Sequence, residues 1–165
     1  MSEHFFGKYR GTVTDVQDPL MLGRVRAKVP DVMGDQESGW AAPCVPFGGS
    51  QMGLFGLPKV GAGVWIEFEH GDPDYPVWTG CWFAQGEMPS ELLAPPYKKV
   101  LLKTEGGHLI VLDDTPGVGG ITLQTSDGQK IVLSSTGLEI TSGQGGTIKI
   151  TGPQVSVNDG ALEVV

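Results

Sequence analysis

The chain lacks several features that would direct its interpretation elsewhere. Its 165 residues include two cysteines, Cys44 and Cys81, which are too few for a disulfide framework. We therefore expect both to be small buried residues of a protein made in a reducing cytosol. No apolar run of about 18 residues is present, so no helical membrane span is expected. The opening segment, MSEHFFGKYR, contains no apolar stretch of the kind found in secretory signal peptides.

Positive charge is also scarce. Lys and Arg number 11 against 19 Asp and Glu, which gives a net charge of −8. An acidic chain without a dense basic patch is repelled by phosphate, so nucleic acid is not an expected partner. The 26 glycines and 12 prolines argue against a helical bundle, while 39% hydrophobic residues suffice for a packed core.

Aromatic residues are missing from the last 68 positions, because all 13 of them lie at or before Tyr97. Aromatics supply much of the buried area of an ordinary core, so a domain without any is unusual. The composition therefore predicts two domains, residues 1–97 and residues 98–165.

The first part reads as short strands separated by Gly and Pro turns. The candidate strands are 9–16, 22–29, 40–45, 63–69 and 76–83. Five short strands with one long connection are typical of an OB-fold-like closed barrel, with a β-sandwich as the alternative. Alternation within two of the strands predicts which side chains face the core: Val25, Ala27 and Val29 in one, and Val64, Ile66 and Phe68 in the other.

A Gly-rich loop at residues 48–61 carries four apolar side chains, Met52, Leu54, Phe55 and Leu57. Two interpretations stay open. The loop packs back on the barrel, or it forms a docking surface for another protein.

The second part repeats a short pattern of alternating aliphatic residues. The candidate strands are 108–112, 121–125, 130–134, 137–141, 147–151, 154–158 and 161–165. Short strands at recurring intervals, separated by Gly-rich turns, are the signature of a repeat architecture.

These strands cannot bury their own apolar face. Each offers about two aliphatic side chains, worth roughly 1.5–3 kcal/mol apiece when buried, against roughly 1–2 kcal/mol per residue for ordering the backbone. We therefore expect a second layer from other copies, as an intertwined trimeric β-helix, or β-prism, with backbone hydrogen bonds between chains. The predicted interior residues are Ile121, Leu123, Ile131, Leu133, Leu138, Ile140, Ile148, Ile150, Val155 and Val157.

Catalytic constellations are sparse. Asp113 and Asp114 are adjacent, so on a strand they point to opposite faces and cannot share one substrate. Asp72 and Asp74 lie in a Pro-rich turn that explains them, with weak Ca²⁺ binding as the alternative. We expect no enzyme, no cofactor and no metal site.

Three stretches resemble one family, the phage baseplate assembly protein V family. They are GKYRGTVTDVQDPLMLGRVRAKVP (7–30), PKVGAGVWIEFEHGDPDYPVWTGCW (58–82) and GGHLIVLDDTPGVGGITLQTSDGQKIVLSSTG (106–137). They occur in the order of the family and together extend over nearly the whole chain.

The resemblance implies a homotrimeric central spike of a contractile phage tail or phage-tail-like injection system. The barrel would sit at the baseplate hub, and the β-helix would form a membrane-piercing needle that touches the target membrane transiently. The resemblance further implies a separate hub protein and, because no histidine lies near the C-terminal ALEVV, a PAAR-type tip protein instead of a metal apex. The spike would be made in the bacterial cytoplasm and assembled into a virion or contractile particle.

A different class of function stays open beside this one. OB barrels often bind oligosaccharides or proteins, and Trp40, Trp65, Trp78 and Trp82 could stack on such a ligand. The alternative hypothesis is therefore a soluble OB-fold binding module.

Overall fold

A computed structural model describes residues 3–95 and 98–164. The chain divides into two compact units, Met1–Glu87 and Met88–Val165, and each is considered by itself. The domain boundary predicted after Tyr97 falls on a residue outside the described ranges, so it stays a prediction.

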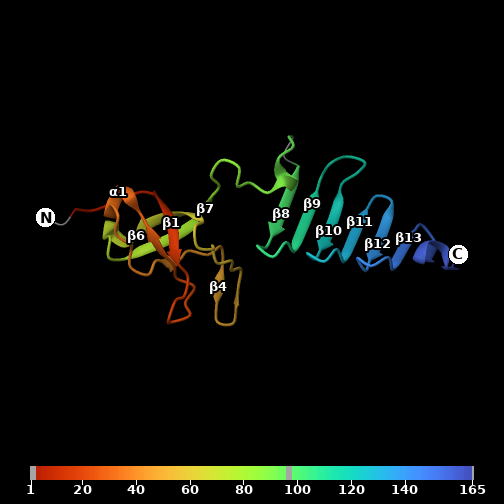
Figure 1. Cartoon of the computed structure of the whole chain (residues 1–165), viewed down its shortest axis with the longest axis horizontal. Coiled ribbons are helices and arrows are strands. Elements are labelled where there is room, and N and C mark those ends of the chain that lie inside the picture. Colours follow the sequence, from red (N-terminus) through yellow and green to blue (C-terminus); the bar gives the residue numbers. More distant parts are fainter. Residues whose placement is uncertain (1–2, 96–97, 165) are drawn as a thin grey trace. The chain divides into compact units, whose positions relative to one another are not determined.

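The first unit is built on a curled five-stranded sheet in the order β2-β1-β6-β7-β3 (Figure 1). Neighbouring strands are antiparallel, except that β3 runs parallel to β7. Beside the edge strands, Val25 and Ala41 exchange two backbone hydrogen bonds that draw the two edges of the sheet together. The predicted all-β, OB-like barrel is confirmed. Its sheet strands are β1 (Tyr9–Asp15), β2 (Arg26–Lys28), β3 (Ala42–Pro43), β6 (Gly63–Phe68) and β7 (Pro76–Trp82).

Shorter elements decorate the connections. They are α1 (Pro30–Met33), the two-stranded hairpin β4 (Gly48–Gly49) and β5 (Met52–Gly53), and the 3-10 turn η1 (Glu69–Gly71). No helix among residues 3–95 and 98–164 is long and apolar enough to cross a membrane.

The core of the barrel contains the side chains that the alternation predicts. Both predicted inward faces, one on β2 and its flanks and the other on β6, are buried. The buried core residues are Val13, Val25, Ala27, Val29, Ala41, Val64, Ile66, Phe68 and Trp78. The barrel therefore has an apolar interior of its own.

Strand β2 is shorter than the predicted strand at 22–29. The backbone N–H groups of Leu22 and Arg24 donate to the carboxylate of Asp18 instead of to a neighbouring strand. Gly23 adopts a φ of 74°, which breaks the extended conformation. The strand therefore begins only at Arg26.

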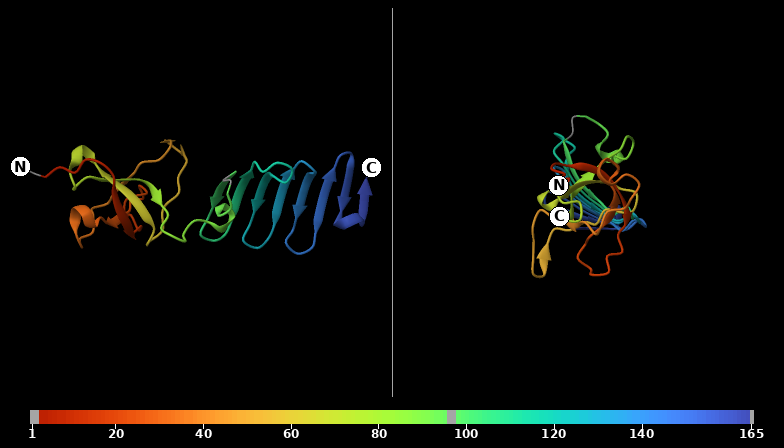
Figure 2. Two further views of the ribbon diagram at one scale, coloured as in Figure 1. Left: turned by 90° about the horizontal axis from the view of Figure 1, so that it is seen from above. Right: turned by 90° about the vertical axis from the view of Figure 1, so that its left-hand side faces the viewer.

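The second unit is an eight-stranded antiparallel meander in which the strands follow one another in chain order (Figures 1 and 2). At about 4.8 Å between strands and about 3.4 Å per residue, the sheet is a narrow ladder roughly 34 Å long and 17 Å wide. Sequence patterning missed its first strand. The strands are β8 (Lys99–Lys103), β9 (Leu109–Asp113), β10 (Gly120–Gln124), β11 (Lys130–Ser134), β12 (Gly137–Thr141), β13 (Thr147–Thr151), β14 (Gln154–Val157) and β15 (Leu162–Val164), with 3-10 turns η2 (Ser90–Leu92) and η3 (Asn158–Gly160).

The expectation that the needle places its backbone hydrogen bonds between chains is wrong. Each strand from β8 to β15 pairs in register with its neighbours in the same chain. The turns are short enough to form hairpins directly, so the local partner takes each backbone group first. Other copies can therefore meet this sheet through side chains.

Glycine is required where strand ends approach a neighbour closely. A Cβ at Gly137 would lie 2.0 Å from the carbonyl oxygen of Ile150, and one at Gly120 would lie 2.1 Å from that of Leu133. Gly137 also has a φ of 138°, which side-chain-bearing residues rarely adopt. The meander thus depends on these positions for its strand spacing.

We predict that Gly137→Ala destabilises the sheet by more than about 1 kcal/mol, because both its φ and its space exclude a Cβ. Thermal melting followed by far-ultraviolet circular dichroism would measure the loss. Gly106→Ala is the matched control, since the nearest atom to its Cβ is 3.8 Å away. Equal melting of the two variants would contradict the close-approach argument.

Candidate functional site

One face of the eight-stranded sheet carries two continuous rows of aliphatic residues, here named the aliphatic face. Register partners across an antiparallel pair share a face, and so do residues two apart along a strand. The first row is Val100, Leu112, Ile121, Leu133, Leu138, Ile150 and Val155. The second row is Leu102, Ile110, Leu123, Ile131, Ile140, Ile148, Val157 and Leu162.

All ten residues predicted for the trimer interior lie in these two rows. The structure thus brings them onto one surface, and their place in an interior between chains stays a prediction. Sequence reasoning missed five further members. They are Val100, Leu102, Ile110, Leu112 and Leu162. The alternation of Val100 and Leu102 between lysines in KVLLK was the signal that would have found the first two.

The aliphatic face is open to solvent in the single chain. Leu133 is 45% exposed and Ile148 is 40% exposed, although both lie in the middle of the sheet. Contiguous exposed apolar surface of this kind marks an interaction site. Burying the exposed part of each such side chain contributes a fraction of the roughly 1.5–3 kcal/mol of full burial, and the two rows add many such contributions in favour of association.

The opposite face of the sheet is largely polar toward its C-terminal strands. Glu139, Lys149 and Ser156 lie there in register, and Thr122 lies on the same face between Val111 and Val132. The Lys149 ammonium group donates to Asp159 at 2.7 Å, and this bond, with the nearby charge of Glu139, raises the pKa of Lys149. This face is therefore suited to remain in water.

The segment before β8 also packs on the polar face. The Lys103 ammonium group, from this face, donates to Glu91 in η2 at 2.6 Å, and that bond lowers the pKa of the Glu91 carboxyl. Lys99 pairs with Asp113 on the same face at 3.3 Å. η2 therefore leaves the aliphatic face uncovered.

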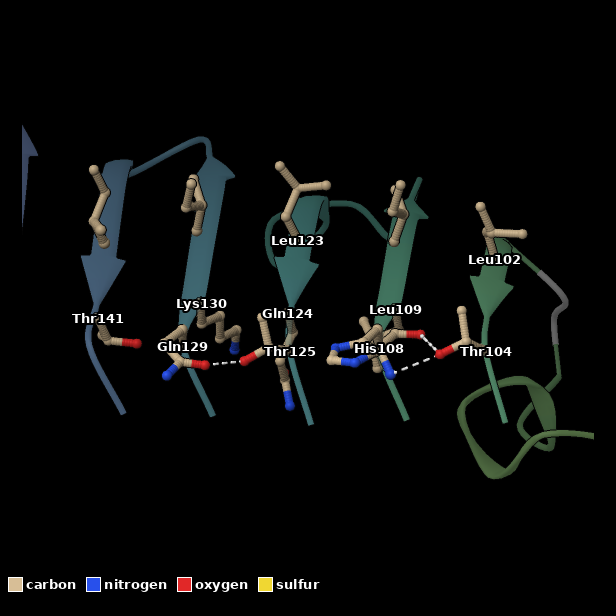
Figure 3. A pocket seen from close by; sticks show the side chains of 13 residues that line it. Leu102, Thr104, His108, Leu109, Leu123, Gln124, Thr125, Gln129, Lys130 and Thr141 are labelled. Atoms are coloured by element: carbon tan, nitrogen blue, oxygen red, sulfur yellow. Dashed lines mark hydrogen bonds between the residues drawn. The ribbon is translucent and has the colours of Figure 1, made fainter. Parts of the chain in front are cut away.

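A hollow of about 560 Å³ lies on the aliphatic face (Figure 3). Figure 3 shows Leu102 and Leu123 in its aliphatic part and a line of polar side chains at the strand ends. Within this line, the His108 backbone N–H donates to the Thr104 hydroxyl at 3.1 Å, and Thr125 bonds Gln129. The polar line marks where the aliphatic face ends.

The hairpin β4–β5 and the residues after it expose the four apolar side chains singled out in the sequence. Met52 is 66% exposed, Leu54 53%, Phe55 54% and Leu57 41%. The Phe55 ring contacts the indole of Trp78 edge-on, so this residue both touches the barrel and faces solvent. The loop therefore packs on the barrel through Phe55, and its use as a docking surface stays a prediction.

The loop Asp18–Arg24, here named the finger, is anchored by one carboxylate. Asp18 accepts backbone bonds from Leu20 at 3.0 Å and Leu22 at 2.8 Å, and its side chain is 4% exposed. The Arg24 guanidinium donates to both oxygens of the same carboxylate. These bonds hold the pKa of Asp18 well below its usual range.

The four tryptophans are already engaged by the protein itself. Trp78 belongs to the core, and its Nε1–H donates to the Gly23 carbonyl oxygen at 3.1 Å. Arg10 stacks on Trp65 and on Trp82, while Arg24 and Arg26 stack on Trp40. These stacks occupy indole faces that a sugar or base would need, so the structure gives the binding-module hypothesis no support.

Candidate catalytic residues do not converge. The described residues hold no group of three or more His, Cys, Asp or Glu placed to bind a metal ion. Asp72 accepts from the Asp74 backbone N–H at 3.0 Å, as a turn residue does. The expectation that Cys44 and Cys81 are buried is wrong, because both are exposed.

Comparison with known proteins gives these two units a class. Residues 9–83 match the type VI secretion system/phage-baseplate injector OB domain, and residues 99–163 match the phage baseplate V C-terminal trimerisation domain. An injector OB domain is thus followed by a trimerisation domain in one chain. The chain belongs to the phage baseplate V family.

Similar proteins include type VI spikes. The chain is 29% identical over 142 residues to the actin cross-linking toxin VgrG1 of Vibrio cholerae, which is 79% of this chain and 13% of that protein. It is 35% identical over 90 residues to the spike protein VgrG3 of Vibrio cholerae, 51% of this chain and 9% of that one. It is 34% identical over 87 residues to the spike protein VgrG5 of Pseudomonas aeruginosa, 52% and 10% respectively. The chain thus spans about a tenth of the length of these relatives.

We predict that Ile131→Asp abolishes trimer formation, because it places one carboxylate per chain on the face that the copies are predicted to bury. Light scattering on the purified chain would measure the loss of mass. Thr122→Asp is the matched control, since Thr122 lies on the polar face of the adjacent strand. A stable trimer of the Ile131 variant would refute the interior assignment.

We predict that Asp18→Asn lowers the denaturant midpoint of the barrel at pH 7. The folded pKa of Asp18 lies below its unfolded value of about 3.9, so its stabilisation is full above about pH 5 and is lost as pH falls through the folded pKa. The difference between wild type and variant should therefore shrink below about pH 4. Tryptophan fluorescence reports the barrel selectively, because all four tryptophans lie there.

The exposed Asp35 supplies the control for this pH experiment, as Asp35→Asn. A difference between wild type and Asp18→Asn that stays constant down to pH 2 would contradict the role given to the Asp18 carboxylate.

Proposed function

We propose that the chain is the structural central spike of a contractile injection system, acting as a homotrimer at the baseplate. The observation that carries this proposal is the aliphatic face, which is continuous over the sheet and exposed in the single chain. The match of this sheet to a trimerisation domain supports the same conclusion. Three such faces brought together supply the interior that one chain lacks.

The proposed spike acts mechanically, so its function depends on stiffness and not on chemical reactivity. Within each chain the strands are joined by hydrogen bonds along the length of the ladder. Across chains the aliphatic rows pack against one another, so separating one chain would expose all three faces to water at a cost that grows with the number of strands. A needle driven through a membrane needs this kind of cooperative resistance.

We propose a separate hub protein as the partner of the barrel, with Met52, Leu54, Phe55 and Leu57 as its contact. Their exposure on and beside a projecting hairpin supports this assignment. Leu54→Asp should weaken capture of the hub without changing the mass of the trimer.

At the other end of the ladder, β15 pairs with β14 alone among the described strands. Its second edge presents unpaired backbone groups, which natural sheets cover. We propose that a PAAR-type tip protein covers this edge, and that this end contacts the target membrane transiently. The chain would reach this position by assembly into a virion or contractile particle after synthesis in the bacterial cytoplasm.

We propose that the chain is not itself an enzyme. A relative carries a toxin name, but the alignment extends over 13% of that protein, and the residues matched here are those of the barrel and the sheet. The structural role of the matched domains supports the proposal.

Native mass tests the proposed function first. We predict a mass close to three times the 17.5 kDa chain by light scattering, with no dependence on concentration across the micromolar range. Thr122→Asp should give the same mass. A full-length monomer would overturn the spike assignment, because a lone ladder leaves its aliphatic face in water.

A further inference from the structure

The finger, Asp18–Arg24, ends in three apolar side chains that project into solvent. Leu20 is 63% exposed, Met21 90% and Leu22 58%. The loop projects from the same side of the barrel as the hairpin β4–β5 (Figures 1 and 2). Three consecutive apolar residues exposed to this extent are unusual for a surface loop, where polar residues are expected.

The root of the finger is rigid. The Asp18 carboxylate binds the backbone of Leu20, Leu22 and Arg24 and the Arg24 side chain. At the far end, the Gly23 carbonyl oxygen accepts from the Trp78 indole, and the Phe55 ring lies 2.6 Å from where a Cβ of Gly23 would be. The tip is therefore held outward by the barrel, and cannot fold down to cover itself.

The tip also stores backbone strain. Met21 has a φ of 53°, in the left-handed region that an unbranched apolar residue rarely occupies. A strained residue that is also the most exposed apolar side chain of the finger gains nothing within its own barrel. The backbone strain and the exposure of the apolar side chain are both offset if a second surface binds the tip.

The second unit of the chain, which matches a trimerisation domain, favours a second copy as the surface that binds the tip of the finger. A trimerisation domain in the same chain holds three barrels within reach of one another, so even a weak contact between barrels is populated at the effective concentration of a short linker, on the order of millimolar. The distribution of charge also favours a second copy. The chain carries −8 overall, whereas the charges of the finger, Asp18 and Arg24, neutralise each other. A neutral apolar tip is what an equally acidic copy can accept.

We propose that in the trimer the finger of each chain packs against the barrel of a neighbouring copy, as a subunit contact separate from the aliphatic face. This inference rests on the proposed trimer. A three-fold contact pairs two different surfaces, so the tip meets a site on the neighbour other than its own finger.

Photo-cross-linking of the full-length trimer tests the proposal. Met21 is replaced by the photoreactive p-benzoylphenylalanine, and light scattering first establishes the mass. We expect irradiation to give cross-linked dimers and trimers on denaturing gels, with the attached peptide in residues 3–87 of another chain. An intact trimer without such cross-links overturns the proposal and leaves the finger free for a hub protein or a membrane. A monomer before irradiation instead identifies failure of the proposed function.

A second variant covers the case in which the probe perturbs the loop. Asn tolerates the left-handed conformation but is polar, so Met21→Asn relieves strain in a free finger and removes the contact of a docked one. We expect Met21→Asn to lower the denaturant midpoint of tryptophan fluorescence in the trimer. An unchanged or higher midpoint would overturn the proposal, with Asp35→Asn as the matched surface control.

Discussion

The exposure of one aliphatic face to water in the single chain is the constraint that dominates the second unit. Two rows of Val, Leu and Ile cross the sheet in register, and apolar surface of this extent is driven out of water by the hydrophobic effect. The chain has no aromatic residue after Tyr97 that could fold over the rows. A ladder of this composition therefore favours association, in agreement with its match to a trimerisation domain.

The barrel solves the same problem differently. It closes its sheet through the Val25 and Ala41 backbone bonds and fills the interior with its own side chains, from Val13 to Trp78. It can therefore carry exposed apolar loops without depending on them for its core. One chain thus combines a barrel that fills its own interior with a sheet whose aliphatic face stays exposed in the single chain.

A few side chains fix the conformation of the finger. The Asp18 carboxylate replaces strand pairing for the finger, and the Trp78 indole and the Phe55 ring fix its far end. Preorganised loops lose little entropy when they bind, so small apolar tips can act as contacts. The Asp18 bonds, together with the φ of 74° at Gly23, explain why the strand after the finger begins late, at Arg26.

Period-two alternation determined much of this protein from sequence alone. It placed the core faces of the barrel and all ten predicted residues of the aliphatic face, because side-chain direction alternates along any strand. It predicted seven of the eight strands of the second unit, β9 to β15. It missed β8, since Val100 and Leu102 lie next to a Pro-rich stretch without aliphatic repeats.

Only the tertiary structure decided which groups partner each other. Intrachain hydrogen bonds replaced the expected interchain ones because consecutive hairpins satisfy the backbone locally. The stacking of arginines on tryptophans and the anchoring of the finger by Asp18 bring together residues whose spacing along the chain carries no periodic signal. The exposure of both cysteines likewise depends on the folded surroundings. Periodicity reports the direction of a side chain, whereas its neighbours depend on how the sheet curls.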